Sequence, residues 1–139
     1  MIAYLDASVI LRRVLNQPGP EIDWSPIEGT ITSSLAEVEC FRALDRIRLS
    51  GNVDEIRLAL AREHIYAALK SCDVLEVGQN VLDRAGAPFP IGIKTLDAIH
   101  LATAMIYRDY SGNPILMATH DRALARASRA MGLEVVGAA

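Results

Sequence analysis

The chain has 139 residues, 51% of them hydrophobic and 22% charged, with a formal net charge of −3. This size suits one folded domain with one substantial core, so we expect residues 1–139 to form a single domain. No apolar run approaches the roughly 18 residues of a membrane span, and Asp6 comes too early for a signal peptide, so we expect a cytoplasmic protein.

Strand and helix patterns alternate along the chain. In order they predict a strand at residues 2–5, a helix at 9–15, a strand at 30–32, a helix from Ser33 or Ser34 to about Leu49, a helix from Asp54 to about Ser71, a strand at 74–77, a helix at about 79–85, a helix capped by Thr95 that ends before a turn at 111–114, a strand at 115–118, a helix at 121–131 and a strand at 133–136. The strands are short apolar runs without alternation, as in a parallel sheet covered on both faces. The sequence therefore predicts an α/β fold.

The helix that begins near Thr95 is apolar on nearly every side. Such a helix is buried, so Asp97 in its first turn is a carboxylate near a buried helix start. One interpretation is that Asp97 only interacts with the helix dipole, which is the usual role of a first-turn acid. The other is that Asp97 is paired or binds a metal, because an isolated buried charge is costly.

Two more acids are expected at the same edge of the sheet as Asp97. Asp6 ends the first strand, and Asp121 follows the fourth strand by three residues. Ligands of open parallel sheets bind beyond the carboxyl ends of the strands, and the helix containing Asp97 begins at that edge. Three separate segments thus bring carboxylates to one place.

Glu39 adds a fourth acid, from the first turns of the second helix. The small or apolar stripe expected to pack on the sheet consists of Ala36, Cys40, Ala43 and Ile47. Glu39 and Arg42 lie on a flank of this stripe, and taken alone an ion pair between them on a solvated face is the simpler interpretation. Glu37 points away and is interpreted as an ordinary surface acid.

Four converging acids repel one another unless a cation lies between them. Mg²⁺ and Mn²⁺ take oxygen ligands, so the pattern favours one of these ions, with the hydroxyls of Ser8 and Thr119 available for hydrogen bonds nearby. A calcium store is disfavoured because the acids are scattered along the chain. A zinc site is disfavoured because His100 and His120 lack a third ligand, and we expect His100 to be a buried structural group.

The acidic net charge argues weakly against a general nucleic-acid binder. Only two of the fourteen basic residues are lysines, however, and several arginines fall in small groups. Arginine suits contacts with phosphate, although solvated helix faces would look similar. The side chains that we expect to hold phosphates near the acids are Arg42, Arg46, Lys94 and Arg122.

Four motifs span nearly the whole chain. They are Tyr4-Leu5-Asp6-Ala7-Ser8, the stretch from Thr32 to Leu44 that contains Glu39, the stretch Thr95-Leu96-Asp97-Ala98-Ile99-His100-Leu101-Ala102-Thr103-Ala104, and Thr119-His120-Asp121 followed by Gly132-Leu133-Glu134-Val135. In this order and at this length, the chain resembles PIN-domain proteins, specifically the VapC-type toxins of toxin–antitoxin pairs.

The resemblance implies a three-layer α/β/α fold with a short parallel sheet flanked by helices. It also implies a Mg²⁺- or Mn²⁺-dependent endoribonuclease that cleaves RNA phosphodiester bonds with a metal-activated water. The catalytic and metal-binding residues implied are Asp6, Glu39, Asp97 and Asp121, with Ser8 and Thr119 beside them. The partners implied are RNA, a small cognate antitoxin and a second toxin subunit, within a larger toxin–antitoxin complex.

Two alternatives remain open. A non-catalytic module that binds nucleic acid or a partner protein would keep the arginines but would not need the acids. A phosphatase of haloacid-dehalogenase type is disfavoured, because it needs a second acid where Ser8 stands, two residues after Asp6.

The second helix also carries apolar residues away from its predicted core stripe. Phe41 and Leu44 are expected to point away from that stripe. They would contact either an antitoxin or second subunit, or the next helix of the same chain.

Overall fold

The computed structural model describes residues 1–139. Its elements are, in chain order, β1 (Ile2–Leu5), α1 (Ala7–Val14), β2 (Gly29–Ser33), α2 (Ser34–Ser50), α3 (Glu55–Lys70), β3 (Asp73–Leu75), α4 (Gln79–Gly86), α5 (Thr95–Ser111), β4 (Ile115–Ala118), α6 (Arg122–Ala130) and β5 (Glu134–Val136). Every element predicted from the sequence is present, and the bounds differ only by a residue or two at the ends. No helix here has the length and apolar character that crossing a membrane requires.

The strands form one parallel sheet in the order β3-β2-β1-β4-β5, with β1 in the centre. In this register Tyr4 lies opposite Ile31 of β2 and Met117 of β4. The ladder continues beyond β1, because the backbone N–H of Asp6 donates to the carbonyl of Ala118 at 3.0 Å. This bond fixes Asp6 at the carboxyl edge of the sheet.

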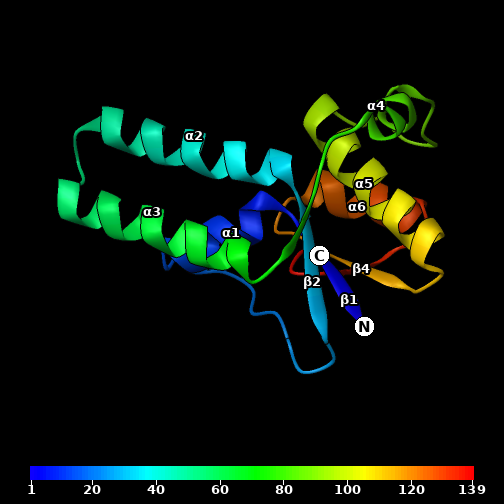
Figure 1. Cartoon of the computed structure of the whole chain (residues 1–139), viewed down its shortest axis with the longest axis horizontal. Helices are drawn as coiled ribbons and strands as arrows, with labels where there is room; N and C mark the ends of the chain where they lie inside the picture. The colour runs from blue at the N-terminus through cyan, green and yellow to red at the C-terminus, as the bar shows by residue number, and fades with distance from the viewer.

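Helices cover both faces of the sheet (Figure 1). On β1, Ala3 and Leu5 join a core cluster with residues of α1, α2 and α3. Tyr4, which lies between them in the sequence, packs on the opposite face with residues of α5 and α6. Because α4 packs on α5, it belongs to the same layer. The expected three-layer α/β/α arrangement is confirmed.

The buried stripe of α2 differs from the expected one. Its fully buried members are Ala36, Cys40 and Leu44. Ala43 and Ile47 are only half-buried, and the prediction that Leu44 points away from the core is wrong. The reason is that α2 packs against α3 as well as against the sheet, so its buried face is rotated. Phe41 contacts Tyr66 of α3, with 4.9 Å between the ring centroids, so the contact within the chain is the one that forms.

The central helix α5 is buried over its middle, as expected. The buried residues are Ala98, His100, Leu101, Ala102, Thr103, Ala104 and Met105. The predicted cap is wrong by one position: Lys94, with an extended backbone (ψ 160°), is the N-cap, and Thr95 is already helical. No side-chain hydrogen bond caps this helix start, so its first amide groups are available to other partners.

Candidate functional site

The four acids expected at one edge of the sheet lie together there. Asp6 follows β1, Glu39 lies in α2, Asp97 lies in the first turn of α5, and Asp121 is the N-cap of α6. All four line one groove of about 440 Å³. Ser8, Arg42, Arg46 and several apolar side chains complete its lining. We call this feature the acidic groove.

Two hydroxyl groups hold the buried carboxylate of Asp6. Ser8 and Thr119 donate to its Oδ2 at 2.7 and 2.8 Å. Each hydroxyl oxygen in turn accepts a backbone N–H, that of His120 on Ser8 and that of Asp121 on Thr119, both at 3.0 Å. The hydroxyl groups are therefore oriented by the loop after β4, and Oδ1 of Asp6 faces away from them toward α5.

Asp121 is held through only one of its oxygens. Its Oδ1 accepts the backbone N–H groups of Ala123 at 2.7 Å and Leu124 at 3.2 Å, which caps α6. The side chain is exposed, so Oδ2 is free to take a further ligand. Capping thus orients this carboxylate and leaves its second oxygen available for a ligand.

Glu39 contacts His100 of α5. His100 Nε2 hydrogen-bonds with Glu39 Oε1, and the ring's Nδ1 hydrogen-bonds with the Tyr4 hydroxyl at 2.6 Å. Nε2 also lies 3.6 Å from Asp6 Oδ1. The simpler expectation of an ion pair between Glu39 and Arg42 is wrong, because Arg42 pairs with Asp45 at 3.1 Å instead.

Sequence reasoning found the burial of His100 but missed its contacts with the acids. The spacing of Tyr4 and Asp6 along the chain gave a signal for these contacts. Tyr4 and Asp6 are two residues apart on an extended segment, so their side chains leave it on the same side. That side is covered by α5, where His100 lies one turn after Asp97.

Burial and neighbouring charges shift the pKa values of three groups at the site. Burial raises the pKa of Asp97 to about 6, and the charges of Asp121 and Asp6 add to the increase. Burial also raises the pKa of Tyr4 well above its ordinary value, assisted by the charge of Asp6. Burial disfavours the charged form of His100, but the hydrogen bond to Glu39 and the charge of Asp6 outweigh it and raise its pKa. Negative charge of neighbouring acids contributes to each of these shifts, alongside burial for Asp97 and Tyr4 and against it for His100.

The donor set fits a divalent cation. Ligand atoms of Asp6, Glu39 and His100 lie within 4.8 Å of one another, and Asp97 and Asp121 line the same groove. Carboxylate oxygens are preferred by hard cations such as Mg²⁺ and Mn²⁺. A cation would relieve the repulsion that adds to the effect of burial on the pKa of Asp97.

Two of the four basic residues expected near the acids line the acidic groove. Arg42 and Arg46 lie along it on α2. Lys94 and Arg122 are exposed at the starts of α5 and α6 and are not part of its lining. Positive charge is therefore concentrated on the α2 side.

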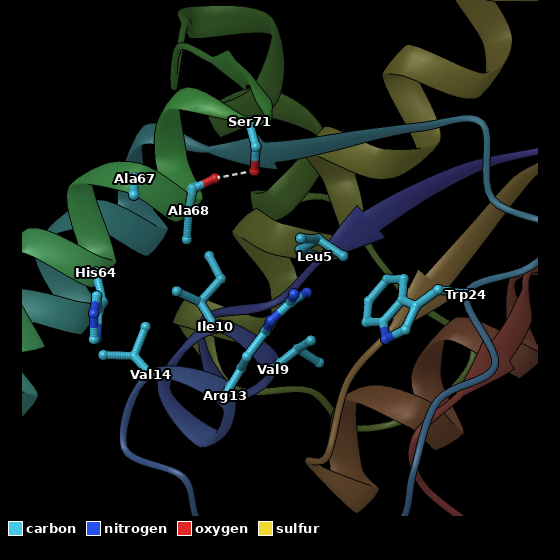
Figure 2. A pocket seen from close by; sticks show the side chains of 10 residues that line it. All are labelled: Leu5, Val9, Ile10, Arg13, Val14, Trp24, His64, Ala67, Ala68 and Ser71. Atoms are coloured by element: carbon cyan, nitrogen blue, oxygen red, sulfur yellow. Dashed lines mark hydrogen bonds between the residues drawn. The ribbon is translucent and has the colours of Figure 1, made fainter.

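A second cavity, of about 410 Å³, lies between α1 and α3 (Figure 2). Its lining is mostly apolar and includes Val9 and Ile10 of α1, Trp24 of the following loop and His64 of α3. No acid lines it. It opens on a different face of α1 from the acidic groove, which Ser8 lines, so it does not share the metal-binding chemistry.

Comparison with known proteins places this geometry in a family. The family model "PIN domain" matches residues 3–130. The chain belongs to the PIN-domain family. It is 32% identical to Ribonuclease VapC46 of Mycobacterium tuberculosis over 136 residues, which cover 96% of this chain and 95% of that protein. This PIN-domain chain is thus similar to a VapC protein over almost its entire length.

Solved structures share the fold. VapBC2 of Rickettsia felis, bound to a DNA fragment from its promoter, matches with a TM-score of 0.66 and 11% identity, covering 97% of each chain. A toxin–antitoxin complex from Klebsiella pneumoniae matches with a TM-score of 0.55 and 17% identity, covering 88% of this chain and 90% of that chain. At these identities the likeness concerns the fold alone.

Replacing Asp97 by Asn should stabilise the metal-free protein at neutral pH. Because the folded-state pKa of Asp97 lies above its ordinary value of 3.8, at about 6, ionisation costs stability as the pH rises through this interval. Thermal unfolding in EDTA should show a higher Tm for the variant at pH 7.5, and the gain should shrink steadily as the pH falls below 6. Asp109→Asn, at an exposed position on the same helix, should show no such gain. A lower Tm for Asp97→Asn at pH 7.5 would mean that the carboxylate stabilises the fold.

Proposed function

We propose that this chain is a metal-dependent endoribonuclease, the toxin component of a VapBC-type toxin–antitoxin pair. One observation carries the proposal: carboxylates from four separate segments line one groove, where burial, together with the charges of Asp121 and Asp6, raises the pKa of Asp97 to about 6. A protein that only binds its partners has no need of such costly clustering. The ribonuclease named above, to which the chain is similar over almost its whole length, supports RNA as the substrate.

Asp6, Glu39, Asp97 and Asp121 would hold Mg²⁺ or Mn²⁺ in the acidic groove, directly or through water. When bound, the ion supplies the two things that phosphodiester hydrolysis needs, which are activation of water and stabilisation of charge on the phosphate oxygens. Oxygen ligands and the open groove suit Mg²⁺, which keeps several of its waters. Mn²⁺ accepts the same ligands.

Other side chains position these ligands and the RNA. The hydroxyls of Ser8 and Thr119 fix the orientation of the Asp6 carboxylate. Arg42 and Arg46, along the groove, would bind phosphates that flank the scissile bond. Lys94 and Arg122 would contact phosphates farther along the strand. These local positive charges offset the acidic net charge where RNA must approach.

The partners follow from the same assignment. We propose a small cognate antitoxin and a second copy of this chain as partners, within a toxin–antitoxin complex. The toxin–antitoxin complex of Klebsiella pneumoniae shares the fold and supports this proposal. We further propose that residues 1–139 act as one PIN-like domain and meet their RNA substrate in the cytoplasm.

Removing one carboxylate of the acidic groove should abolish RNA cleavage. The purified, antitoxin-free protein is incubated with a pool of small RNAs in Mg²⁺, Mn²⁺ or EDTA, beside Asp97→Asn and Glu39→Gln. We expect cleavage only with metal, and a loss of about 100-fold or more in both variants, because each loses a carboxylate that would hold the ion. Glu37→Gln, at an exposed position on the same helix as Glu39, is the matched control and should retain full activity.

Three outcomes would count against the assignment. Cleavage that persists in EDTA would remove the metal from the mechanism. Full activity in Asp97→Asn would remove that residue from the site. A wild-type protein that binds RNA but leaves the whole pool uncut with either ion would favour the non-catalytic binding module.

Arg46→Ala should weaken RNA binding in a salt-dependent way. A contact between arginine and phosphate releases counterions, so its loss should lower the slope of log Kd against log salt concentration by about 1. Binding is measured with the inactive Glu39→Gln protein, so that RNA stays intact. Arg62→Ala, at an exposed position on α3 outside the acidic groove, should leave the slope unchanged. Equal effects of the two substitutions would place the RNA elsewhere.

A further inference from the structure

A buried hydrogen-bonded chain connects the centre of the sheet to the acidic groove. It runs from the Tyr4 hydroxyl to His100 Nδ1 and from His100 Nε2 to Glu39 Oε1. Tyr4 and His100 are both fully buried, and their rings meet edge to face, 5.7 Å apart and at 73°. The Glu39 side chain is 25% exposed. This series of hydrogen bonds therefore begins in the core and ends at Glu39, which reaches the acidic groove.

The direction of the last bond does not depend on the charge of the ring. The ionised carboxylate of Glu39 can only accept a hydrogen bond, so Nε2 must carry the proton that it receives. If the ring is neutral, Nδ1 accepts from Tyr4; if it is protonated, Nδ1 donates to the Tyr4 oxygen instead. In both cases an N–H group in a fixed position points at Glu39.

This arrangement limits the freedom of Glu39. A glutamate on a helix near solvent has several rotatable bonds, and holding it in one position costs conformational entropy. Arg42, one turn along α2, pairs with Asp45 at 3.1 Å and not with Glu39. His100 instead holds Oε1 in the groove and leaves Oε2 available, with its own Nε2 also 3.6 Å from Asp6 Oδ1.

We propose that His100, oriented by Tyr4, is a positioning residue that holds Glu39 in place to bind the divalent cation. This inference rests on the metal site proposed above and adds two residues to it. The ring's Nε2 is also close to Asp6, so one imidazole group contacts Glu39 and lies near a second acid. Groups that orient metal ligands in this way typically change metal affinity about 10- to 100-fold when they are removed.

The contacts favour this role over direct ligation by His100. Both ring nitrogens are already engaged, Nδ1 by Tyr4 and Nε2 by Glu39. Nε2 could bind a cation only after losing its proton and its bond with Glu39. The two roles also differ in their chemistry, because an imidazole ligand favours later transition metals whereas a positioned carboxylate serves Mg²⁺ and Mn²⁺ alike.

Metal titration of the purified protein separates the possibilities. Calorimetry gives the Kd for Mg²⁺ and for Mn²⁺ in the wild type, His100→Leu, His100→Gln and Tyr4→Phe. We expect His100→Leu, which fills the space without a donor, to weaken binding of both ions by a similar factor of about 10 to 100. His100→Gln keeps an N–H donor that reaches Glu39, so it should recover most of the loss. Tyr4→Phe removes only the hydroxyl and should weaken binding less than His100→Leu.

Tyr107→Phe is the matched control, since it removes the hydroxyl of a half-buried tyrosine on the same helix as His100. It should leave both Kd values unchanged. Circular dichroism and Tm in EDTA show whether each variant is folded; if His100→Leu does not fold, His100→Gln and Tyr4→Phe still decide the question. A folded His100→Leu protein with wild-type affinities for both ions would overturn the inference. So would a pair of results in which Tyr4→Phe binds the ions with unchanged affinity and His100→Gln binds them as weakly as His100→Leu.

Two further results have a distinct meaning. A loss for Mn²⁺ far greater than that for Mg²⁺ in His100→Leu would show that His100 is itself a ligand, and would overturn the positioning role. Failure of the wild-type protein to bind either ion would overturn the metal site, and with it the proposed function. Binding by the wild type with no change in the variants would contradict the positioning role alone.

Discussion

Repulsion among the four carboxylates of the acidic groove is the constraint on which the rest of the site depends. The chain counters it with donors that hold three of the acids: two hydroxyls for Asp6, His100 for Glu39, and backbone amides for Asp121. Asp97 has no such hydrogen bond, and its pKa rises to about 6 as burial and its acidic neighbours disfavour its charge. The uncompensated charge at Asp97 is what a divalent cation would neutralise, so the same feature that costs stability creates the metal affinity.

The parallel sheet brings the four acids together near the starts of helices. Asp6 and Asp121 are the N-caps of α1 and α6, and Asp97 lies in the first turn of α5, where the helix dipole favours negative charge. Glu39 lies one turn farther along α2. The helices α1, α2 and α6 each follow a strand directly, so they all begin at the carboxyl edge of the sheet, and α5 begins there because it leads back into β4. The fold therefore brings four helix starts, and with them four acids, to one edge.

The order of elements and the meeting of the acids could be predicted from the sequence, because both follow from local periodicity and from the rule that parallel strands end together. Apart from the N-cap of α5, the errors concern side-chain directions set by tertiary packing. Leu44 is buried because α3 covers α2, and Arg42 pairs with Asp45 whereas Glu39 bonds with His100. The role of His100 could not be read from helix spacing alone, since it depends on Tyr4 and Glu39, which are remote in the sequence.

Anomalous scattering from crystals grown with Mn²⁺ would locate the ion. We expect a peak in the acidic groove, with carboxylate oxygens of Asp6 and at least one other of the four acids bonded to the ion. We also expect Glu39 to keep its hydrogen bond to His100 when the ion is present. A groove without a peak in crystals saturated with Mn²⁺, or an ion bound only by residues outside the groove, would mean that these four carboxylates do not form a metal site.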